Sequence, residues 1–181
     1  MANNALRWLS WKISFKRAVR RELRPPKLWR RAFPLFVPPR YKLVFMPNPI
    51  RVQDGVLFAL QAHAQGGPHH ERCGLLAGCE GVITRVLHAH NIAADPATQY
   101  EIAPAELFHL MREIRGAGLQ LLGIYHSHPH GANEPSRTDV QRAYYPDAAY
   151  FIISPQPHEE RPVRAFAIRD GFVSELNISS A

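Results

Sequence analysis

The sequence predicts an α/β domain in which a mixed β-sheet is flanked by helices. Two observations support this fold class: short apolar runs bounded by turn residues, which are typical of strands, and two longer segments with apolar residues at helical spacing. The 181 residues, 46% of them hydrophobic, suffice for one buried core. No stretch has the roughly 18 to 20 apolar residues of a membrane-spanning helix, and the N-terminus lacks a secretory signal, so a cytoplasmic protein is expected.

The positive charge of the chain belongs to its first 40 residues. Residues 1–40 contain 11 Lys and Arg and one acid, Glu22, whereas residues 41–181 contain 11 basic and 14 acidic residues. Residues 6–24 fit an amphipathic helix, and the prolines that follow them interrupt any helix and predict a linker. We therefore expect a basic, Pro-rich leader over residues 1–40 and a folded domain over residues 41–181.

Residues 6–24 allow three interpretations. The segment is a peripheral membrane anchor, a basic arm that contacts an acidic partner, or a leader without ordered structure.

Nucleic-acid binding by the domain is not expected. The excess of basic residues stops at residue 40, and no pattern of basic and aromatic residues typical of a nucleic-acid groove follows it.

The first half of the domain is expected to hold a strand, a helix and a hairpin. A short strand is predicted over residues 42–46, and apolar residues at helical spacing predict a helix over residues 53–64. The apolar segments over residues 73–77 and 82–88 flank a Glu-Gly turn. That arrangement favours two antiparallel strands joined by a tight turn.

The second half begins with a helix and continues with strands. Pro104 fits the first turn of a helix that ends near two glycines, Gly116 and Gly118. A buried strand is predicted next, over residues 119–126. Further strands are predicted over residues 150–154, 163–168 and 172–176.

A His-Ser-His-Pro motif at the end of the strand over residues 119–126 carries the strongest chemical signal. Side chains alternate along a strand, so His126 and His128 project to the same side, and both imidazoles can reach one ion. Ten residues then lead to Asp139, which can add a carboxylate near the start of a short helix. Two His and one Asp favour Zn²⁺ over Mg²⁺ or Ca²⁺ and leave the fourth tetrahedral position open for water, as in a catalytic site.

A water activated by zinc also needs a base, and Glu71 is the best candidate. It precedes the strand over residues 73–77, which is expected to run beside the strand over residues 119–126. Ser136, three residues before Asp139, either donates its hydroxyl to an oxyanion or caps the short helix. Cys73 shares the strand parity of Glu71, but a role as a small buried hydrophobe is favoured over contact with the metal.

These motifs together resemble the JAMM or MPN-type zinc metallopeptidases. The resemblance rests on Glu71 in Glu-Arg-Cys-Gly-Leu-Leu-Ala-Gly, on Gly-Ile-Tyr-His-Ser-His-Pro at residues 123–129, and on Pro-Ser-x-x-Asp at residues 135–139. It covers roughly residues 43–176. It implies one zinc ion per chain held by His126, His128 and Asp139, with Glu71 as general base and acid and Ser136 as the oxyanion donor.

The same resemblance implies a fold and a reaction. The fold is a mixed sheet flanked by helices, with a layout related to that of cytidine deaminases. The reaction is hydrolysis of an amide or isopeptide bond after the C-terminal glycine of a ubiquitin-like or sulfur-carrier protein. The chain is too compact for the insertions with which larger members select ubiquitin linkages, so a linkage-specific ubiquitin protease is not expected.

The sequence leaves two questions open. The first is whether the domain is a non-catalytic scaffold, because relatives with this fold can lack the metal; the complete ligand set favours the enzyme. The second is how substrate binds. A tail ending in Gly-Gly is expected to add as a strand beside an exposed sheet edge at residues 125–128, with the polar loop at residues 130–134 flanking the scissile bond.

Overall fold

The computed structural model describes residues 48–181. The leader over residues 1–40, the amphipathic segment over residues 6–24 and the strand predicted over residues 42–46 lie outside the described residues. Within the described part, no helix is long and apolar enough to cross a membrane.

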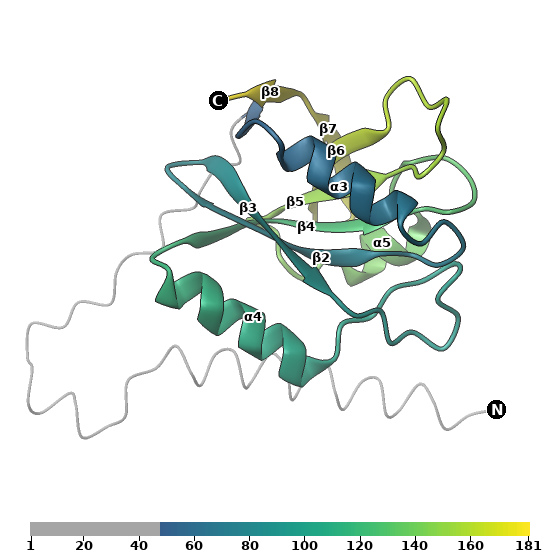
Figure 1. The fold of residues 1–181 in the computed structure, drawn as a ribbon, viewed down its shortest axis with the longest axis horizontal. Coiled ribbons are helices and arrows are strands. Elements are labelled where there is room, and N and C mark those ends of the chain that lie inside the picture. The colour runs from purple at the N-terminus through teal and green to yellow at the C-terminus, as the bar shows by residue number, and fades with distance from the viewer. Residues whose placement is uncertain (1–47) are drawn as a thin grey trace, which may run out of the picture. The chain divides into compact units, whose positions relative to one another are not determined.

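In residues 48–181, eight strands form one mixed sheet in the order β7-β6-β5-β4-β2-β3-β1-β8 (Figure 1). β4 runs parallel to β5, and β1 runs parallel to β3 and β8, whereas the other neighbours are antiparallel. The strands are Ile50–Val52 (β1), Cys73–Cys79 (β2), Val82–Ala89 (β3), Gln120–Ser127 (β4), Ala149–Ile153 (β5), Val163–Arg169 (β6), Phe172–Leu176 (β7) and Ile178–Ser180 (β8).

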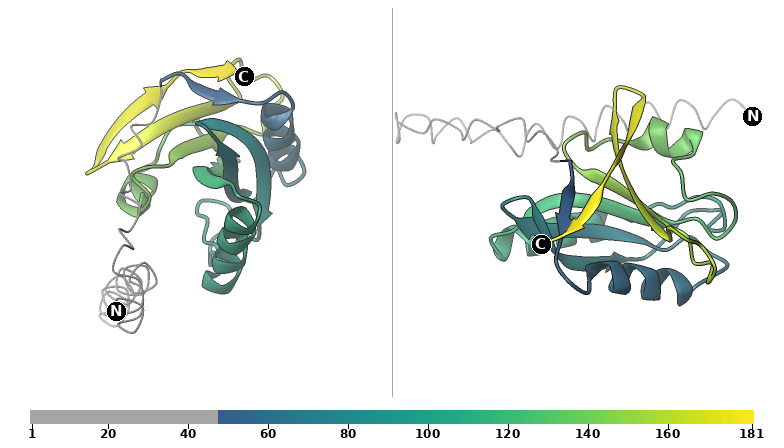
Figure 2. Two further views of the ribbon diagram at one scale, coloured as in Figure 1. Left: turned by 90° about the vertical axis from the view of Figure 1, so that its left-hand side faces the viewer. Right: turned by 90° about the horizontal axis from the view of Figure 1, so that it is seen from above.

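Helices cover both faces of this sheet, which confirms the predicted fold class. α3 (Val56–Gln65) and α4 (Pro104–Gly116) lie on opposite faces (Figure 1), and Figure 2 shows how the sheet curves between them. α3 packs its buried Val56, Leu60 and Ala64 into one apolar core, and α4 packs Leu110 and Ile114 into a second. The short α5 (Arg137–Arg142) contributes Val140 to the α4 side.

The predicted hairpin is confirmed, and the backbone conformation of its two turn residues accounts for the tight connection between the strands. β2 and β3 pair antiparallel from Cys73 opposite Ala89 to Cys79 opposite Val82. The two turn residues both have positive φ, 51° at Glu80 and 75° at Gly81. This conformation matches the twist of the flanking strands, and glycine adopts it without steric cost.

The first helix begins three residues later than the sequence predicts, at Val56. The amide of Gln53 is hydrogen-bonded to the carbonyl of Ile83 (2.8 Å), which continues the pairing of β1 with β3. Gly55 then takes a left-handed φ of 86°, which a right-handed helix cannot include. β1 and β8 were not predicted, because three-residue strands are too short to show an alternating pattern.

β4 lies inside the sheet, so the expected exposed edge at residues 125–128 is wrong. Tyr125 is paired with Gly74 of β2 on one side and with Phe151 of β5 on the other. At the last residue of β4, the amide of Ser127 donates to the carbonyl of Arg72 (2.8 Å), and just after the strand the amide of His128 donates to the carbonyl of Ile153 (2.9 Å). The backbone there has no free edge to which a substrate strand can add.

Candidate active site

β4 carries both histidines of the motif to its C-terminal end. His126 is paired with Cys73 and with Ile152, which fixes its backbone from both sides, and its side chain is 1% exposed. His128 follows just after the strand and is also buried. The two Nε2 atoms lie 3.0 Å apart, so the alternation along the strand aims both rings at one point, as the sequence predicts.

Asp139 reaches the same point from the first turn of α5. Its Oδ1 lies 3.3 Å from Nε2 of His126, and its Oδ2 lies 3.5 Å from Nε2 of His128. The carboxylate is held by a capping box: Oδ2 accepts the amide of Ser136 (2.7 Å), and the amide of Asp139 donates to the hydroxyl of Ser136 (3.2 Å). The local signal for a helix start therefore also positions this carboxylate.

The three donors fit a divalent zinc ion. In the described residues they form a group of His and carboxylate atoms that lie within 4.8 Å of one another. Tetrahedral zinc with bonds of about 2.0 to 2.1 Å needs ligand atoms roughly 3.3 Å apart. The 3.0 Å between the two Nε2 atoms and the 3.3 Å from Oδ1 of Asp139 to Nε2 of His126 are close to this spacing. Two imidazoles with one carboxylate also suit zinc better than magnesium or calcium.

The ring of His128 is oriented by a hydrogen bond to its own loop. Its Nδ1 donates to the carbonyl of Ala132 (2.8 Å), so Nε2 carries the lone pair that a metal requires. The loop is itself held in place, because the buried side chain of Asn133 donates to the carbonyl of Arg161 (2.6 Å). The loop at residues 130–134 therefore borders the site at His128.

The ring of His126 is oriented differently. Its Nδ1 is buried and has no hydrogen-bond partner. The ring instead stacks on Tyr100, with ring centroids 4.5 Å apart and an angle of 21° between the planes. Burial lowers the pKa of His126, although Asp139 acts in the opposite direction, so the neutral form that binds metal is favoured.

Neighbouring groups also shift the pKa values of the other two metal-binding candidates, His128 and Asp139. Burial acts to lower the pKa of His128, but the hydrogen bonds to Asp139 and to the carbonyl of Ala132 outweigh it and raise the value. Burial acts to raise the pKa of Asp139, but contacts with His126, His128 and Ser136 hold it well below its usual range. Asp139 is therefore an anion at neutral pH and can act as the charged ligand.

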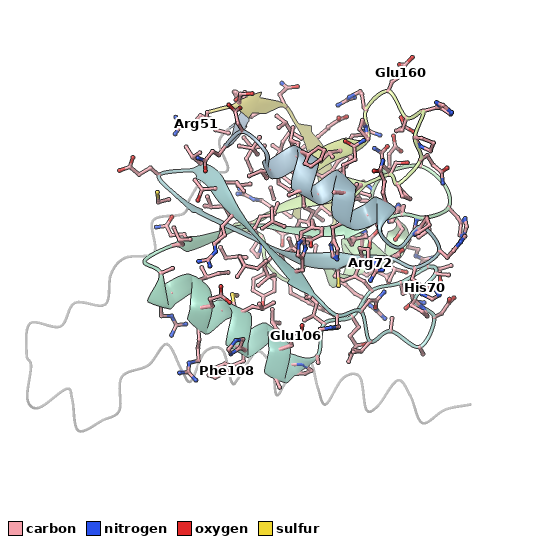
Figure 3. The ribbon with its side chains drawn as sticks, viewed as in Figure 1. Arg51, His70, Arg72, Glu106, Phe108 and Glu160 are labelled. Atoms are coloured by element: carbon pink, nitrogen blue, oxygen red, sulfur yellow. The ribbon has the colours of Figure 1, made fainter. Side chains whose placement is uncertain are left out.

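Glu71 lies beside these donors. β2 pairs with β4 as predicted, with Cys73 opposite His126, and Glu71 enters the site just before β2 with 4% of its surface exposed. The next residue, Arg72, directs its guanidinium away, to the carbonyl of Gly66 after α3 (Figure 3). Burial raises the pKa of Glu71 to about 7, which His128 partly opposes and Asp139 and Asp95 reinforce.

Ser136 occupies the capping position that the sequence analysis kept as an alternative. Its hydroxyl oxygen accepts the amide of Asp139, so the N-cap role is present in the structure. The hydroxyl also lies within hydrogen-bonding reach of the Asp139 carboxylate and helps to keep it ionised, as a hydroxyl can accept one bond and donate another. Cys73 is fully buried in the apolar core on the α4 side, and its thiol donates to the carbonyl of Ala89 (3.8 Å).

Two residues of the site were missed in the sequence. Tyr100 stacks on His126, and Asn91 donates to the backbone carbonyl of Glu71 (2.9 Å). Both lie in the connection between β3 and α4, which has neither helical nor strand periodicity. Only their three-dimensional contacts identify them.

Comparisons with known proteins identify the family of this domain. Residues 54–169 match the family described as prokaryotic homologs of the JAB domain. A relative named desampylase, from Haloferax volcanii, is 41% identical over 106 residues, which cover 57% of this chain and 76% of the relative. A relative named CysO-cysteine peptidase, from Mycobacterium tuberculosis, is 36% identical over 125 residues, which cover 68% of this chain and 86% of the relative.

The fold also has a close counterpart among solved structures. The solution structure of protein DSY2949 from Desulfitobacterium hafniense superposes with a TM-score of 0.63 and 28% sequence identity. The alignment covers 72% of this chain and 92% of that protein. The described domain therefore has the overall architecture of that protein.

Proposed function

The chain belongs to the family of prokaryotic homologs of the JAB domain and is a hydrolase, and we propose that it is a zinc-dependent peptidase that cleaves an amide or isopeptide bond. The observation that carries this proposal is the convergence of His126, His128 and Asp139 beside the buried carboxylate of Glu71. Three ligands with a neighbouring base are the parts that hydrolysis by an activated water requires.

Each residue has one role in the proposed reaction. Zinc, when bound to the two histidines and Asp139, acts as a Lewis acid that lowers the pKa of a water to about 7. Glu71 accepts a proton from the attacking water and later donates it to the leaving amine, so that the C–N bond breaks and a carboxylate and an amine are released. Ser136 turns its hydroxyl hydrogen from the Asp139 carboxylate and donates it to the carbonyl oxygen as negative charge develops there.

The environment of Glu71 suits both halves of this proton transfer. A carboxyl with its ordinary pKa of 4.5 is a weak acid catalyst at neutral pH, because it is almost entirely ionised. Burial raises the pKa of Glu71 to about 7 in the metal-free protein, and a nearby dication lowers it again. The dication therefore favours the carboxylate form of Glu71 that accepts a proton, and burial favours the protonated form that donates it to the leaving amine.

For the substrate, we propose a ubiquitin-like or sulfur-carrier protein with a C-terminal Gly-Gly tail. The proposal is supported by the relative named CysO-cysteine peptidase and by the family to which the chain belongs. Because β4 has no free edge, the tail cannot pair with the strand that carries the histidines. We place it instead between two loops that border the site: residues 130–134, which contact His128, and residues 91–102, which contact Glu71 and His126.

The test uses purified protein and a ubiquitin-fold carrier that bears a peptide after its terminal Gly-Gly. Intact mass is measured with and without a chelator, and bound zinc is measured by elemental analysis. We expect one zinc per chain and loss of the extension that the chelator abolishes. The matched control is Asp139→Ala, which should neither bind zinc tightly nor cleave. Absence of zinc from the wild-type protein would contradict the proposal and favour a scaffold; bound zinc without cleavage would reject the tested carrier as substrate.

A further inference from the structure

The connection between β3 and α4 folds back on itself next to the candidate active site. Asn91 and Ile102 form an isolated antiparallel bridge, and the amide of Ile92 donates to the carbonyl of Glu101 (2.8 Å). We call residues 91–102 the 91–102 loop. Its ends are thus closed by backbone bonds, while its interior needs other contacts to keep one shape.

The side chain of Asn91 supplies those contacts. Its Nδ2 donates to the carbonyls of Glu71 and Gln99, both at 2.9 Å. Its Oδ1 accepts the amides of Ala93 (3.0 Å) and Glu101 (3.1 Å). A carboxamide has two donor hydrogens and two acceptor lone pairs, so all four positions are used. The orientation of the amide is also fixed, because both neighbours of Nδ2 are carbonyls and both neighbours of Oδ1 are N–H groups.

One pair of these bonds holds Tyr100. Gln99 and Glu101 are the residues before and after Tyr100, and Asn91 binds the carbonyl of the first and the amide of the second. The backbone on both sides of Tyr100 is therefore clamped to one side chain. The ring of Tyr100 stacks on His126, whose Nδ1 has no hydrogen-bond partner to orient the imidazole.

Another bond holds Glu71. Glu71 precedes β2 and so lies outside the hydrogen-bonded ladder of the sheet. Its carbonyl accepts from Asn91, and its amide donates to the carbonyl of Pro96 (2.7 Å), which belongs to the same loop. Both backbone hydrogen-bonding groups of Glu71 are thus bound to the 91–102 loop.

We propose that Asn91 is a positioning residue for the active site, because its carboxamide ties the backbone of Glu71 to the two residues that flank Tyr100. The role rests on the proposed function, in which Glu71 is the base and His126 binds zinc. Asn91 acts on the base directly through the backbone of Glu71, and on the metal site indirectly through Tyr100. Its loss is expected to affect both turnover and metal affinity without removing any group that touches substrate.

The test compares Asn91→Ala and Asn91→Asp in the full chain. The alanine variant removes all four bonds. The aspartate variant keeps the acceptors for Ala93 and Glu101 but places a carboxylate against the carbonyls of Glu71 and Gln99, so it isolates the two donor bonds. Asn48→Ala is the matched control, since Asn48 also makes a side-chain bond to backbone, to the amide of Asn177 (2.9 Å).

Three readouts are expected to change together. With saturating zinc, kcat falls about 10- to 100-fold in both Asn91 variants, while KM changes less than about threefold. The zinc dissociation constant, measured by competition with a chromophoric chelator, rises about tenfold. Amide hydrogen exchange in the metal-free protein accelerates at Glu101 in Asn91→Ala but not in β4. Asn48→Ala changes none of these by more than twofold.

A double-mutant cycle on zinc affinity tests whether Asn91 acts through Tyr100. Tyr100→Ala removes the ring from His126 and should weaken zinc binding about tenfold, whereas Tyr100→Phe keeps the ring and should stay within twofold of the wild type. The Asn91→Ala/Tyr100→Ala variant should be no weaker than Tyr100→Ala alone.

Two outcomes would overturn the inference. One is an Asn91→Asp variant whose kcat and zinc affinity match those of Asn48→Ala. The other is a double variant in which the two losses multiply, because independent effects exclude action through Tyr100. Failure of the proposed function looks different: the wild-type chain would bind no zinc, while Glu101 would still lose its exchange protection in Asn91→Ala.

Discussion

Replacing the base should make the metal-free protein more stable while it makes the enzyme inactive. Glu71→Gln keeps the shape of the side chain and removes its charge. In the metal-free protein the pKa of Glu71 is raised from 4.5 to about 7, chiefly by burial. The folded state therefore disfavours the ionised carboxylate, and the free energy of unfolding of the wild-type protein falls as pH rises through this window.

The size of the effect follows from that shift. A rise from 4.5 to about 7 corresponds to about 3 kcal/mol at 1.36 kcal/mol per pH unit. Below pH 4.5 the carboxyl is protonated in both folded and unfolded chains, so Glu71→Gln should be no more stable than the wild type there. Between pH 4.5 and about 7 the stability difference between the variant and the wild type grows, and at pH 8 it reaches its full value.

The assay is urea denaturation of chelator-treated protein at several pH values between 4 and 8. Glu160→Gln is the control, because Glu160 is exposed and its replacement should change stability by less than about 0.5 kcal/mol at any pH. Zinc should reduce the advantage of Glu71→Gln, since a dication favours the carboxylate. A stability difference that is the same at pH 4 and pH 8 would refute the argument from burial. Activity should fall by about 10² to 10⁴, with zinc still bound.

Five other variants test the remaining parts of the site and the domain boundary. His126→Ala and Asp139→Ala should each lose tight zinc binding and activity together, which elemental analysis and the cleavage assay check; activity with normal zinc content in either variant would exclude that residue as a ligand. Ser136→Ala should cost about 1 kcal/mol of stability as a lost helix cap and about 10² to 10³ in kcat, whereas Ser136→Asp, which caps the helix but has no hydrogen to donate, should restore the stability but not the rate, and full activity in the aspartate variant would remove the oxyanion role. Removal of residues 1–40 should leave kcat/KM and zinc content within twofold of the full chain, and a larger loss would place part of the active site in the leader.

The parts of the site that could be predicted depend on local geometry. Strand alternation places His126 and His128 on one side whatever the rest of the fold does, and the Ser136 to Asp139 spacing is a helix-capping signal that also aims a carboxylate. The turn between β2 and β3 needs positive φ, and the glycine in its sequence indicates this conformation. Such features depend on neighbours within a few residues, so a single sequence is enough to find them.

The features that could not be predicted depend on which segments become neighbours. The expected free edge at residues 125–128 was wrong because the sequence does not show that β5 joins β4 on the side away from β2. Asn91 and Tyr100 were missed because their contacts, Glu71 and His126, lie 20 and 26 positions away along the chain. Asparagine in a loop has many roles, and only its four partners distinguish this one.

The metal ligands and the base are held by different kinds of structure, and this difference has a consequence for mutation. His126 lies in a strand paired on both sides, and Asp139 lies in a capped helix, so regular hydrogen bonds fix both backbones. The backbone of Glu71 instead makes its hydrogen bonds to the 91–102 loop. Changes in that loop should therefore reduce kcat more than zinc affinity, whereas changes that weaken β4 should reduce both to the same degree. Measuring the two quantities across a set of loop and strand variants would reveal this asymmetry, and loop variants that lose zinc affinity but keep the wild-type kcat at saturating zinc would show that the base does not depend on the loop.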